Sequence, residues 1–547
     1  MSAPSGRGSA LVGIGIGVSR LAGLLRETVA GRVLGNGVAN DALVAALRIP
    51  NLLQNLLGEG VLSASFVPVY SELLDGEDRQ QASRVAGAVG ALLMMVTALA
   101  VLIIVLAARP LTRLLAWGLT GERFDLAVEF TRITALGVGF LVMSAWCLGI
   151  LNSHRSFLLP YAAPVIWNLA QIVALLVAWQ QDWDLADAAR GVAIAVAIGG
   201  LLQLVIQLPA VLRLARGMRI AFDNRNVHVR EVRRRFGPAV LGRGAVQLSA
   251  YLDLILASFL AAGALSALFR AQMLYTLPVS LFAMSVAAAE LPEMSRLAGD
   301  PALVAARANT AMRRIAFWML AASLLLIAAG EPLVAALFEG GEFTSADTSL
   351  VWLVLVFYAF GLPAIGLSRM LQNASYAMGD TSGPARVAAI RVTVAAAVGA
   401  AAMFPLDRAF IGPDGVEQLG DVFAFAGPLE AAVRDDDSVV RLGAIGLAVG
   451  SAVGAWVELF LLSRVLDRRL PRLRPPSAAL WPPALAASIA FAATAALKRA
   501  TGALPSIPAA LITIGVGGFV YVIMCFRTGV RESDMVLRPA RKVIWRR

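Results

Sequence analysis

The sequence is poor in the residues that most enzymes use for catalysis, with only two cysteines and two histidines in 547 residues. The histidines, His154 and His228, lie far apart and outside any HExxH pattern, which argues against a zinc site. No CxxC pair or disulfide framework is present. The two lysines, Lys498 and Lys542, do not belong to a GKS or GKT motif, so a Walker A nucleotide site is excluded. No GxSxG motif lies near a His/Asp pair. We therefore do not expect an enzyme, and we expect no metal and no bound cofactor.

Charged residues are also scarce, at 15% of the chain, whereas 59% of the residues are hydrophobic and the mean hydropathy is +0.74. Soluble domains carry roughly 25% charged residues, and one aqueous core cannot hold such an apolar excess. The surplus must face lipid, and a spanning helix needs roughly 20 mostly apolar residues. We predict an all-α polytopic membrane protein with fourteen transmembrane helices, near 10–34, 40–72, 84–108, 126–151, 158–180, 186–212, 236–262, 265–290, 312–330, 348–376, 385–404, 442–463, 477–497 and 505–526.

The net charge of +11 is concentrated in alternate loops and in the C-terminal tail. The positive-inside rule places such basic loops in the cytoplasm, and anionic lipid headgroups explain the charge without nucleic acid. The opposite loops are acidic, so the two loop sets support the count of fourteen spans. We expect both termini to be cytoplasmic and the protein to be a multi-pass membrane protein. The basic set is 213–235, 296–314, 464–474 and 527–547, and the acidic set is 180–187, 331–347 and 405–441.

An internal repeat divides the first twelve predicted spans into two copies of six. The run AGRVLGNG at 30–37 has a counterpart in LASFLAAG at 256–263, at an offset of about 225 residues. Six helices per copy give both copies the same orientation, so two pseudo-symmetric lobes should flank a central site. We predict a first lobe at 1–217, a second lobe at 218–470 with an extracytoplasmic insertion at 405–441 and no assigned role, a final helix pair at 471–527, and a basic cytoplasmic tail at 528–547.

Two prolines, Pro50 and Pro278, fall at comparable points in the second helix of each copy. A mid-helix proline removes a hydrogen bond and bends the helix, and matching interruptions in two repeats indicate a central binding site. An incidental pair of kinks is the other interpretation. Small residues predict close helix packing, in a GxxxGxxxG series at Gly446, Gly450 and Gly454.

Ionisable residues inside apolar segments are the main functional signal. Each charge at a helix centre costs at least ~2.5–3.5 kcal/mol on insertion scales, so it must face a hydrated cavity or pair internally. The candidates are Arg20, Arg26, Glu27, Arg32, Asp41, Arg48, Glu59, Arg132, Asp253, Arg270, Glu290, Arg391 and Glu458.

Arg20 and Arg26 are separated by about 9 Å of helix rise. Guanidinium groups donate bidentately to phosphate oxygens and stay charged, so this spacing suits a diphosphate in a cavity. These arginines and Arg32 could instead snorkel to the interface or pair with acids. We favour the cavity for Arg20 and Arg26, and pairing or snorkelling for Arg32 and Glu290.

At these residues the chain resembles the MurJ/MviN family. The resemblance is carried by SRLAGLLRETVAGRVLGNGVANDALVAALRIPNLLQNLLGEGVLSASFVPVYSELL at 19–74, by PLVAALFEGGEFTSADT at 332–348, by YAFGLPAIGLSRMLQNASYAMGDTSGP at 358–384 and by GAIGLAVGSAVGAWVELFLL at 443–462. It implies fourteen helices in two lobes plus a final pair, within the multidrug/oligosaccharidyl-lipid/polysaccharide exporter superfamily. It also implies translocation of lipid II, an undecaprenyl-diphosphate peptidoglycan precursor for cell-wall synthesis, by alternating access.

The resemblance also implies a substrate site. The family's first-helix arginines match Arg20 and Arg26, and its second-helix acid, basic residue and glutamate match Asp41, Arg48 and Glu59. The acid after the second arginine is Glu27 where Asp is usual, and a basic pair of some members is Gln54–Asn55 here. An arginine expected near Met273 is absent, and Arg270, which lies one turn earlier, could replace it.

Several alternatives stay open at this stage. The chain could export another lipid-linked oligosaccharide or an amphipathic drug, or serve as a degenerate membrane scaffold. Without ATPase motifs, transport should draw on the membrane potential or on a coupling monovalent cation. Asp253 is a candidate ligand for that cation, and a structural ion pair is the favoured alternative for this residue. The expected partners are lipid II or a related undecaprenyl-diphosphate lipid and anionic membrane lipids, with no nucleic acid, and we expect a monomer.

Overall fold

The computed structural model describes residues 6–223, 225–412, 415–418, 427–436, 438–502 and 504–537, apart from the side chains of 6–12 and 241–250. Residues 538–547 of the predicted basic tail therefore lie outside the described residues. Contacts divide the chain into two compact units. Unit 1 contains Met1–Leu265, Gly341–Phe343 and Ala431–Asp437, and unit 2 contains Ser266–Gly340, Thr344–Glu430 and Ser438–Arg547.

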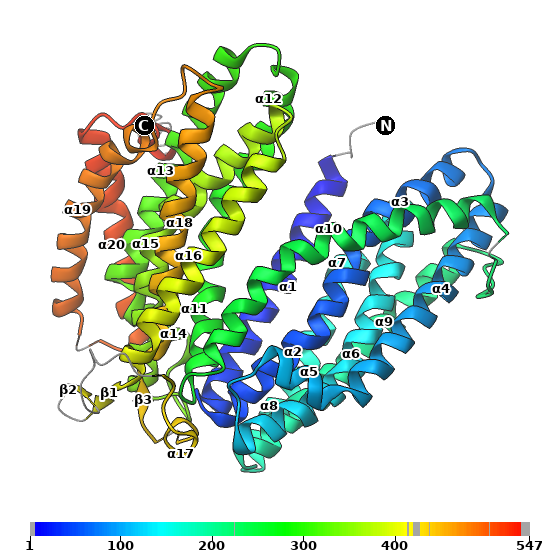
Figure 1. Cartoon of the computed structure of the whole chain (residues 1–547), viewed down its shortest axis with the longest axis horizontal. Helices are drawn as coiled ribbons and strands as arrows, with labels where there is room; N and C mark the ends of the chain where they lie inside the picture. The colour runs from blue at the N-terminus through cyan, green and yellow to red at the C-terminus, as the bar shows by residue number, and fades with distance from the viewer. Residues whose placement is uncertain are drawn as a thin grey trace, which may run out of the picture. The chain divides into compact units, whose positions relative to one another are not determined.

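Unit 1 is a bundle of helices arranged around α6, whose side chains are buried along most of its length. This burial follows from an almost uninterrupted apolar sequence, which packs against α2, α4 and α9 (Figure 1). Helix α1 lies against α7 and α8. The helices are α1 (Gly6–Leu34), α2 (Val38–Leu57), α3 (Glu59–Asp75), α4 (Arg79–Leu106), α5 (Ala108–Leu115), α6 (Gly121–Ser153), α7 (Leu158–Ala162), α8 (Pro164–Gln180), α9 (Leu185–Leu214) and α10 (Val227–Ala257).

Unit 2 is built around α15, which packs against α13 and α18. Pro278 ends α11 directly before a π-helical segment, η1, so the predicted proline interruption coincides with a real irregularity. The helices are α11 (Ala264–Pro278), η1 (Val279–Met284), α12 (Ser285–Arg296), α13 (Pro301–Ala328), α14 (Gly330–Phe338), α15 (Ser345–Ala377), α16 (Ser382–Asp407), α18 (Gly443–Asp467), α19 (Pro476–Ala500) and α20 (Ser506–Arg527).

The predicted glycine series brings α16 and α18 into close contact. A Cβ atom added at Gly450 would lie 2.4 Å from the carbonyl oxygen of Ala395, and one at Gly446 would lie 2.4 Å from the backbone nitrogen of Met403. Real Cβ atoms do not approach backbone atoms so closely, so glycine permits this helix contact. The packing prediction is confirmed.

Two acids in the helices of unit 2, Glu458 and Glu290, are paired internally. Arg391 donates to Glu458 at 2.9 Å, and Gln372 donates to the other carboxylate oxygen at 2.7 Å. Glu290, for which pairing was favoured, accepts from Arg307 at 2.8 Å. These partners offset the cost of placing charge among apolar helices.

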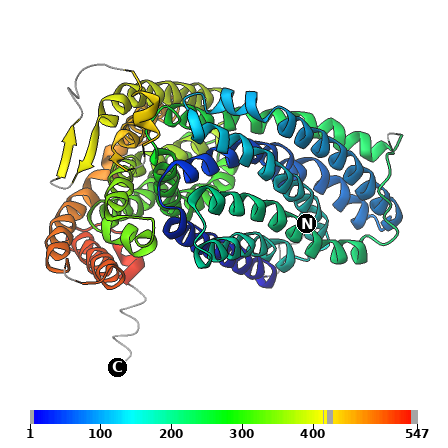
Figure 2. The same ribbon diagram turned by 90° about the horizontal axis from the view of Figure 1, so that it is seen from below.

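The described residues of the insertion at 405–441 include a small β-sheet and a short helix. Helix α16 extends into the insertion as far as Asp407, and the strands β1 (Ala409–Gly412), β2 (Gly415–Gln418) and β3 (Val440–Arg441) form an antiparallel sheet in the order β2-β1-β3. Figure 2 shows β1 and β2 as a yellow hairpin. The short helix α17 (Ala431–Arg434) and the residues after it belong to unit 1 by their contacts.

Twelve stretches of the described residues, three of them made of consecutive helices, are long and apolar enough to cross a membrane, and they coincide with twelve of the fourteen predicted segments. The other two segments, 10–34 and 236–262, correspond to the long helices α1 and α10, which include residues whose side chains are not described. The prediction of an all-α polytopic fold with about fourteen spans is therefore confirmed. Helix α10, which the sequence analysis assigned to the second lobe, groups with unit 1, and the lobe boundaries stay a prediction.

Candidate functional site

A polar cavity of about 770 Å³ lies in unit 1 between α2, α3 and α8. Its lining is dominated by amide and hydroxyl side chains, with one carboxylate and one indole ring. Such groups offer both hydrogen-bond donors and acceptors, so the cavity suits a ligand rich in hydroxyl and amide groups. The lining residues are Asn51, Gln54, Asn55, Glu59, Gly60, Ser63 and Trp167.

The cavity exists because the predicted segment 40–72 is two helices and not one. Helix α2 ends at Leu57, Gly58 is extended, and α3 begins at Glu59. The Gly58 N–H donates to the Gln54 carbonyl at 2.8 Å, and a Cβ atom at Gly58 would lie 2.3 Å from that same oxygen. Pro50 lies within α2, eight residues before the break. The close approach requires glycine, and the break exposes Glu59 at the first turn of α3.

The indole of Trp167 links the cavity to the predicted arginines. The Arg26 guanidinium lies 5.0 Å from the centre of the Trp167 ring, at a distance typical of a cation–π contact. Arg26 also forms an ion pair with Glu27, and its side chain remains only 15% exposed. The Trp167 indole N–H is buried and has no hydrogen-bond partner among the described residues. A buried donor of this kind is costly unless a ligand or water satisfies it.

The predicted substrate residues divide into different environments. Glu59 lines the cavity, and Arg26 with Glu27 lies behind its Trp167 wall. Arg20 is exposed on α1, about one and a half turns before Arg26. Arg48 is half-buried on α2, and its backbone carbonyl accepts from Tyr251 at 3.0 Å. None of the predicted arginines is itself a lining residue, so a direct phosphate contact stays a prediction.

Asp41, in contrast, is fully buried in an ionic network at the start of α2. Its carboxylate pairs with Arg123 of α6 at 3.4 Å, and both side chains are 0% exposed. The Gly263 N–H donates to the same carboxylate oxygen at 3.0 Å, and Arg123 also donates to the carbonyl of Leu260 at 3.1 Å. In this structure Asp41 therefore contacts protein groups away from the cavity lining.

The insertion supplies the second acid of this network. Asp435 lies 3.3 Å from Nε of Arg123 and accepts from Thr120 at 3.1 Å. Its neighbour Arg434 donates to the carbonyl of Gly118 at 2.7 Å and accepts from the Ala262 N–H at 2.7 Å. Residues 434 and 435 thus cover one end of unit 1.

Sequence reasoning missed Arg123 and Asp435. Arg123 stands between Glu122 and Asp125 at a helix start, where charges are usually solvated, and Asp435 belongs to an acidic run in a long polar segment. Arg123 pairs with Asp41, 82 residues away along the chain, and with Asp435, 312 residues away, so no local spacing connects them.

The remaining predicted residues lie elsewhere. Arg270 of unit 2 is buried, with its guanidinium 5.8 Å from the centre of the Phe338 ring. Asp253 is exposed on α10 of unit 1. Among the described residues, no group of three or more His, Cys, Asp or Glu side chains could hold a metal ion.

The fold and the cavity define a class, namely a polytopic helical membrane protein with a polar cavity inside one of its helical units. Comparisons with known proteins refine that class. The family model for lipid II flippase MurJ matches residues 30–412, more than half of the chain. The chain therefore belongs to the MurJ lipid II flippase family, and the resemblance seen in the sequence is confirmed.

Individual relatives support the family assignment. A probable lipid II flippase MurJ of Vibrio cholerae is 31% identical over 384 residues, which cover 68% of this chain and 72% of that protein. The lipid II flippase MurJ of Burkholderia cenocepacia is 31% identical over 380 residues, covering 68% and 73%. A probable lipid II flippase MurJ of Rhizobium meliloti is 27% identical over 541 residues, covering 96% and 94%.

Solved structures confirm the fold over nearly the whole chain. A lipid II flippase MurJ in an inward closed conformation has a TM-score of 0.72 at 21% identity, covering 97% of this chain and 99% of that one. An inward-facing multidrug resistance transporter of the MATE family has a TM-score of 0.61 at 14% identity, covering 83% and 95%.

Proposed function

We propose that this chain translocates lipid II, the undecaprenyl-diphosphate-linked precursor of peptidoglycan, across the bacterial inner membrane by alternating access. The single observation that carries the proposal is the amide-lined cavity beside the Arg26–Trp167 contact, in a chain of the lipid II flippase family. Such a cavity offers an aqueous path for a sugar–peptide headgroup that would be insoluble in hydrocarbon.

The chemistry of the cavity fits the two parts of such a headgroup. Sugar hydroxyls and peptide amides can exchange hydrogen bonds with Asn51, Gln54 and Ser63, and the indole N–H of Trp167 gains an acceptor. We assign the diphosphate to guanidinium groups next to the cavity. Arg26 is held there by its ion pair with Glu27 and its contact with Trp167. Arg20 on α1 and Arg48 on α2 are the other two candidates.

The cavity lining contains amides and no arginine, and this composition affects how readily the ligand can dissociate. Neutral hydrogen bonds are individually weak in net terms, at about 0.5–1.5 kcal/mol, whereas bonds to charged groups are about 1.5–3 kcal/mol. A lining of amides can therefore recognise the headgroup without holding it permanently. The prenyl tail stays in lipid, along a groove that the family resemblance assigns to the last two helices.

Transport without an ATPase motif needs another energy source. Moving one charge through a membrane potential of about 100 mV releases ~2.3 kcal/mol. We assign the driving force to the membrane potential or to a monovalent cation gradient, with Asp253 as the candidate cation ligand. The chain acts as a transporter without catalysis, as a monomer, with both termini in the cytoplasm and with anionic lipids around it.

The test is reconstitution of the purified protein in liposomes that contain fluorescently labelled lipid II. Wild-type protein should move the label between leaflets, and an imposed potential should raise the rate. Labelled phosphatidylcholine should not move. A protein that scrambles both lipids equally, or neither, would contradict the proposal.

The variant Arg26→Ala isolates the predicted phosphate group. We expect it to abolish complementation of a flippase-depleted strain and to remove transport in liposomes, while expression and folding stay intact. The matched control is Arg216→Ala, the same change at an exposed residue after α9, which should transport normally. Full complementation by Arg26→Ala would remove this residue from the mechanism.

A further inference from the structure

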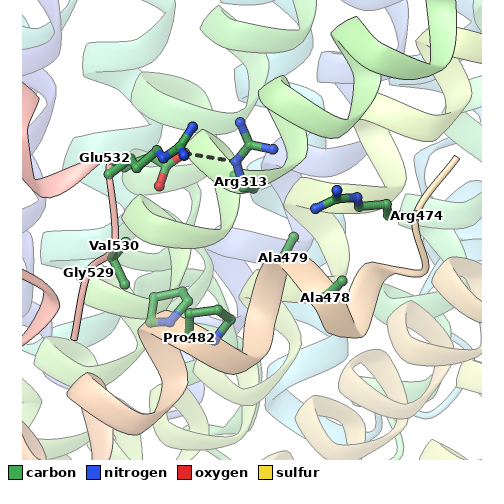
Figure 3. A pocket seen from close by; sticks show the side chains of 10 residues that line it. Arg313, Arg474, Ala478, Ala479, Pro482, Gly529, Val530 and Glu532 are labelled. Atoms are coloured by element: carbon green, nitrogen blue, oxygen red, sulfur yellow. Dashed lines mark hydrogen bonds and ion pairs between the residues drawn. The ribbon is translucent and has the colours of Figure 1, made fainter. Parts of the chain in front are cut away.

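Two neighbouring hollows in unit 2 share one residue, Arg474, and neither belongs to the site described above. The first, here called the arginine pocket, has a volume of about 340 Å³ and lies between α13, the start of α19 and the residues after α20 (Figure 3). The second, here called the α18–α19 groove, has a volume of about 510 Å³. Because Arg474 lines both, a ligand at Arg474 can extend into either one.

The arginine pocket carries an excess of positive charge. Arg313, Arg474 and Arg531 line it together with a single acid, Glu532. Glu532 is only 9% exposed and accepts from Nε of Arg313 at 3.2 Å. Figure 3 shows the two terminal nitrogens of Arg313 pointing away from Glu532. The pair therefore fixes the Arg313 guanidinium and leaves its bidentate edge oriented away from the acid.

The backbone around Arg474 is held in place from α13. The Arg474 N–H donates to the side-chain oxygen of Asn309 at 2.8 Å, and the Asn309 amide donates to the carbonyl of Arg472 at 3.0 Å. The side chain of Arg474 takes no part in these bonds. These bonds fix the backbone at Arg474 before a ligand binds, so less backbone conformational entropy is lost on binding.

The α18–α19 groove changes from polar to apolar along its length. Trp456, Phe460 and Arg464 follow one another at intervals of four residues, so they lie on one face of α18 over about 12 Å. The Arg464 guanidinium lies 4.4 Å from the centre of the Phe460 ring. Phe460 is 53% exposed on a helix apolar enough to span a membrane. The charge at one end of the groove suits the headgroup of a lipid, and the exposed aromatic surface at the other end suits its apolar chain.

We propose that Arg474, with Arg313 and Arg464 on its two sides, binds the phosphate of an acidic glycerophospholipid, whose acyl chain lies in the α18–α19 groove. Guanidinium groups bind phosphate oxygens bidentately, and basic pockets between spanning helices are suited to anionic headgroups. Four arginines against Glu532 and Asp467 leave two positive charges in the combined hollows. This excess disfavours a zwitterionic headgroup, whose ammonium group would be repelled. The proposal does not depend on lipid II transport.

The test measures binding of fluorescent phosphatidylglycerol to the delipidated full-length protein in neutral detergent. Arg474→Gln should weaken binding by about fivefold or more, the effect of one arginine on an anionic headgroup. The matched control is Arg472→Gln, which makes the same change of charge in the same loop at an exposed residue that lines neither hollow. It should bind like the wild type. Phe460→Ala should also weaken binding, because the groove loses apolar contact.

Three results would overturn the proposal. Equal losses in Arg474→Gln and Arg472→Gln would indicate nonspecific attraction to a basic loop. Equal binding of phosphatidylcholine would remove the role of the excess charge. Displacement of the lipid by millimolar inorganic phosphate, with no loss in Phe460→Ala, would indicate a site for free phosphate. Thermal unfolding of each variant establishes that the loss is not a loss of fold.

Discussion

The two acids Asp41 and Glu59 lie in one predicted transmembrane segment, yet they have opposite surroundings. Asp41 is 0% exposed and pairs with Arg123, whereas Glu59 is exposed and lines the polar cavity. The difference comes from residues far away in the chain, because α6 brings Arg123 to Asp41 and the turn between α10 and α11 brings the Gly263 N–H. An acid inside an apolar segment is therefore a structural or a binding residue according to its tertiary partners.

The largest loss of stability should come from removing Arg123 from its buried ion pair with Asp41. Arg123→Ala leaves Asp41 and Asp435 without their guanidinium partner, and removal of one member of a buried ion pair costs about 3–5 kcal/mol. We expect a large fall in the thermal unfolding temperature of the purified protein and poor expression.

The control for this comparison is Arg132→Ala, at an exposed arginine of the same helix. Because this change leaves no buried acid without its guanidinium partner, it should lower the unfolding temperature much less than Arg123→Ala does. Equal stability of Arg123→Ala and Arg132→Ala would mean that the Asp41 network does not stabilise unit 1.

The cavity should respond in the opposite way, with a loss of transport and not of stability. Glu59→Gln keeps the size of the side chain but removes its charge and replaces one acceptor oxygen by an amide donor. A hydrogen bond to a charged group is worth about 1.5–3 kcal/mol, so we expect lipid II transport in liposomes to fall by about tenfold or more.

The unfolding temperature of Glu59→Gln should match that of the wild type, apart from a few tenths of a kcal/mol for the loss of an acid at the first turn of α3. Normal transport with reduced stability would reverse the assignment and make Glu59 a structural acid like Asp41.

A smaller effect is expected at the other end of α6, where His154 hydrogen-bonds with Tyr70 at 2.9 Å. Burial lowers the pKa of His154 below its ordinary value of about 6.5, and the charge of Arg79 lowers this pKa further. The folded state thus favours the neutral ring. The resulting stabilisation is complete above about pH 6.5 and is lost as the pH falls below that value.

Thermal unfolding at pH 7.5 and pH 5.5 measures this effect. The wild type should lose more stability between these two values than His154→Gln does. His228→Gln, the same change at the other histidine of the chain, should keep the wild-type dependence. An unchanged dependence in His154→Gln would show that this ring does not couple to folding.

Much of the architecture could be predicted from the sequence because lipid imposes a strong local pattern. Apolar runs of spanning length predicted the membrane-spanning helices. The series at Gly446, Gly450 and Gly454 predicted a close helix contact, which is the contact between α16 and α18. The break at Gly58 was missed, since glycine inside an apolar run does not by itself end a helix. It ends α2 here because the backbone of Gln54 comes too close for any side chain.

The candidate site was predictable only in part. Arg26 and Glu59 could be found as charges inside apolar segments, and they lie at the cavity or behind its wall. The amides Asn51 and Gln54 carry no charge and gave no such signal. Arg123 and Asp435 gave none either, because their role depends on tertiary ion pairs, of Arg123 with Asp41 and of Asp435 with Arg123. The insertion, which had no role in the sequence, acquires a structural one through Asp435.

The most direct test of the central claim is protection of the cavity by its ligand. Ser63→Cys places a thiol in the cavity lining, while the native Cys147 and Cys525 are buried. Lipid II should slow maleimide labelling of this thiol, and phosphatidylglycerol should not. Arg216→Cys, in the exposed loop after α9, should label at the same rate with either lipid. Labelling of Ser63→Cys that is unchanged by saturating lipid II would contradict the assignment of this cavity to the headgroup.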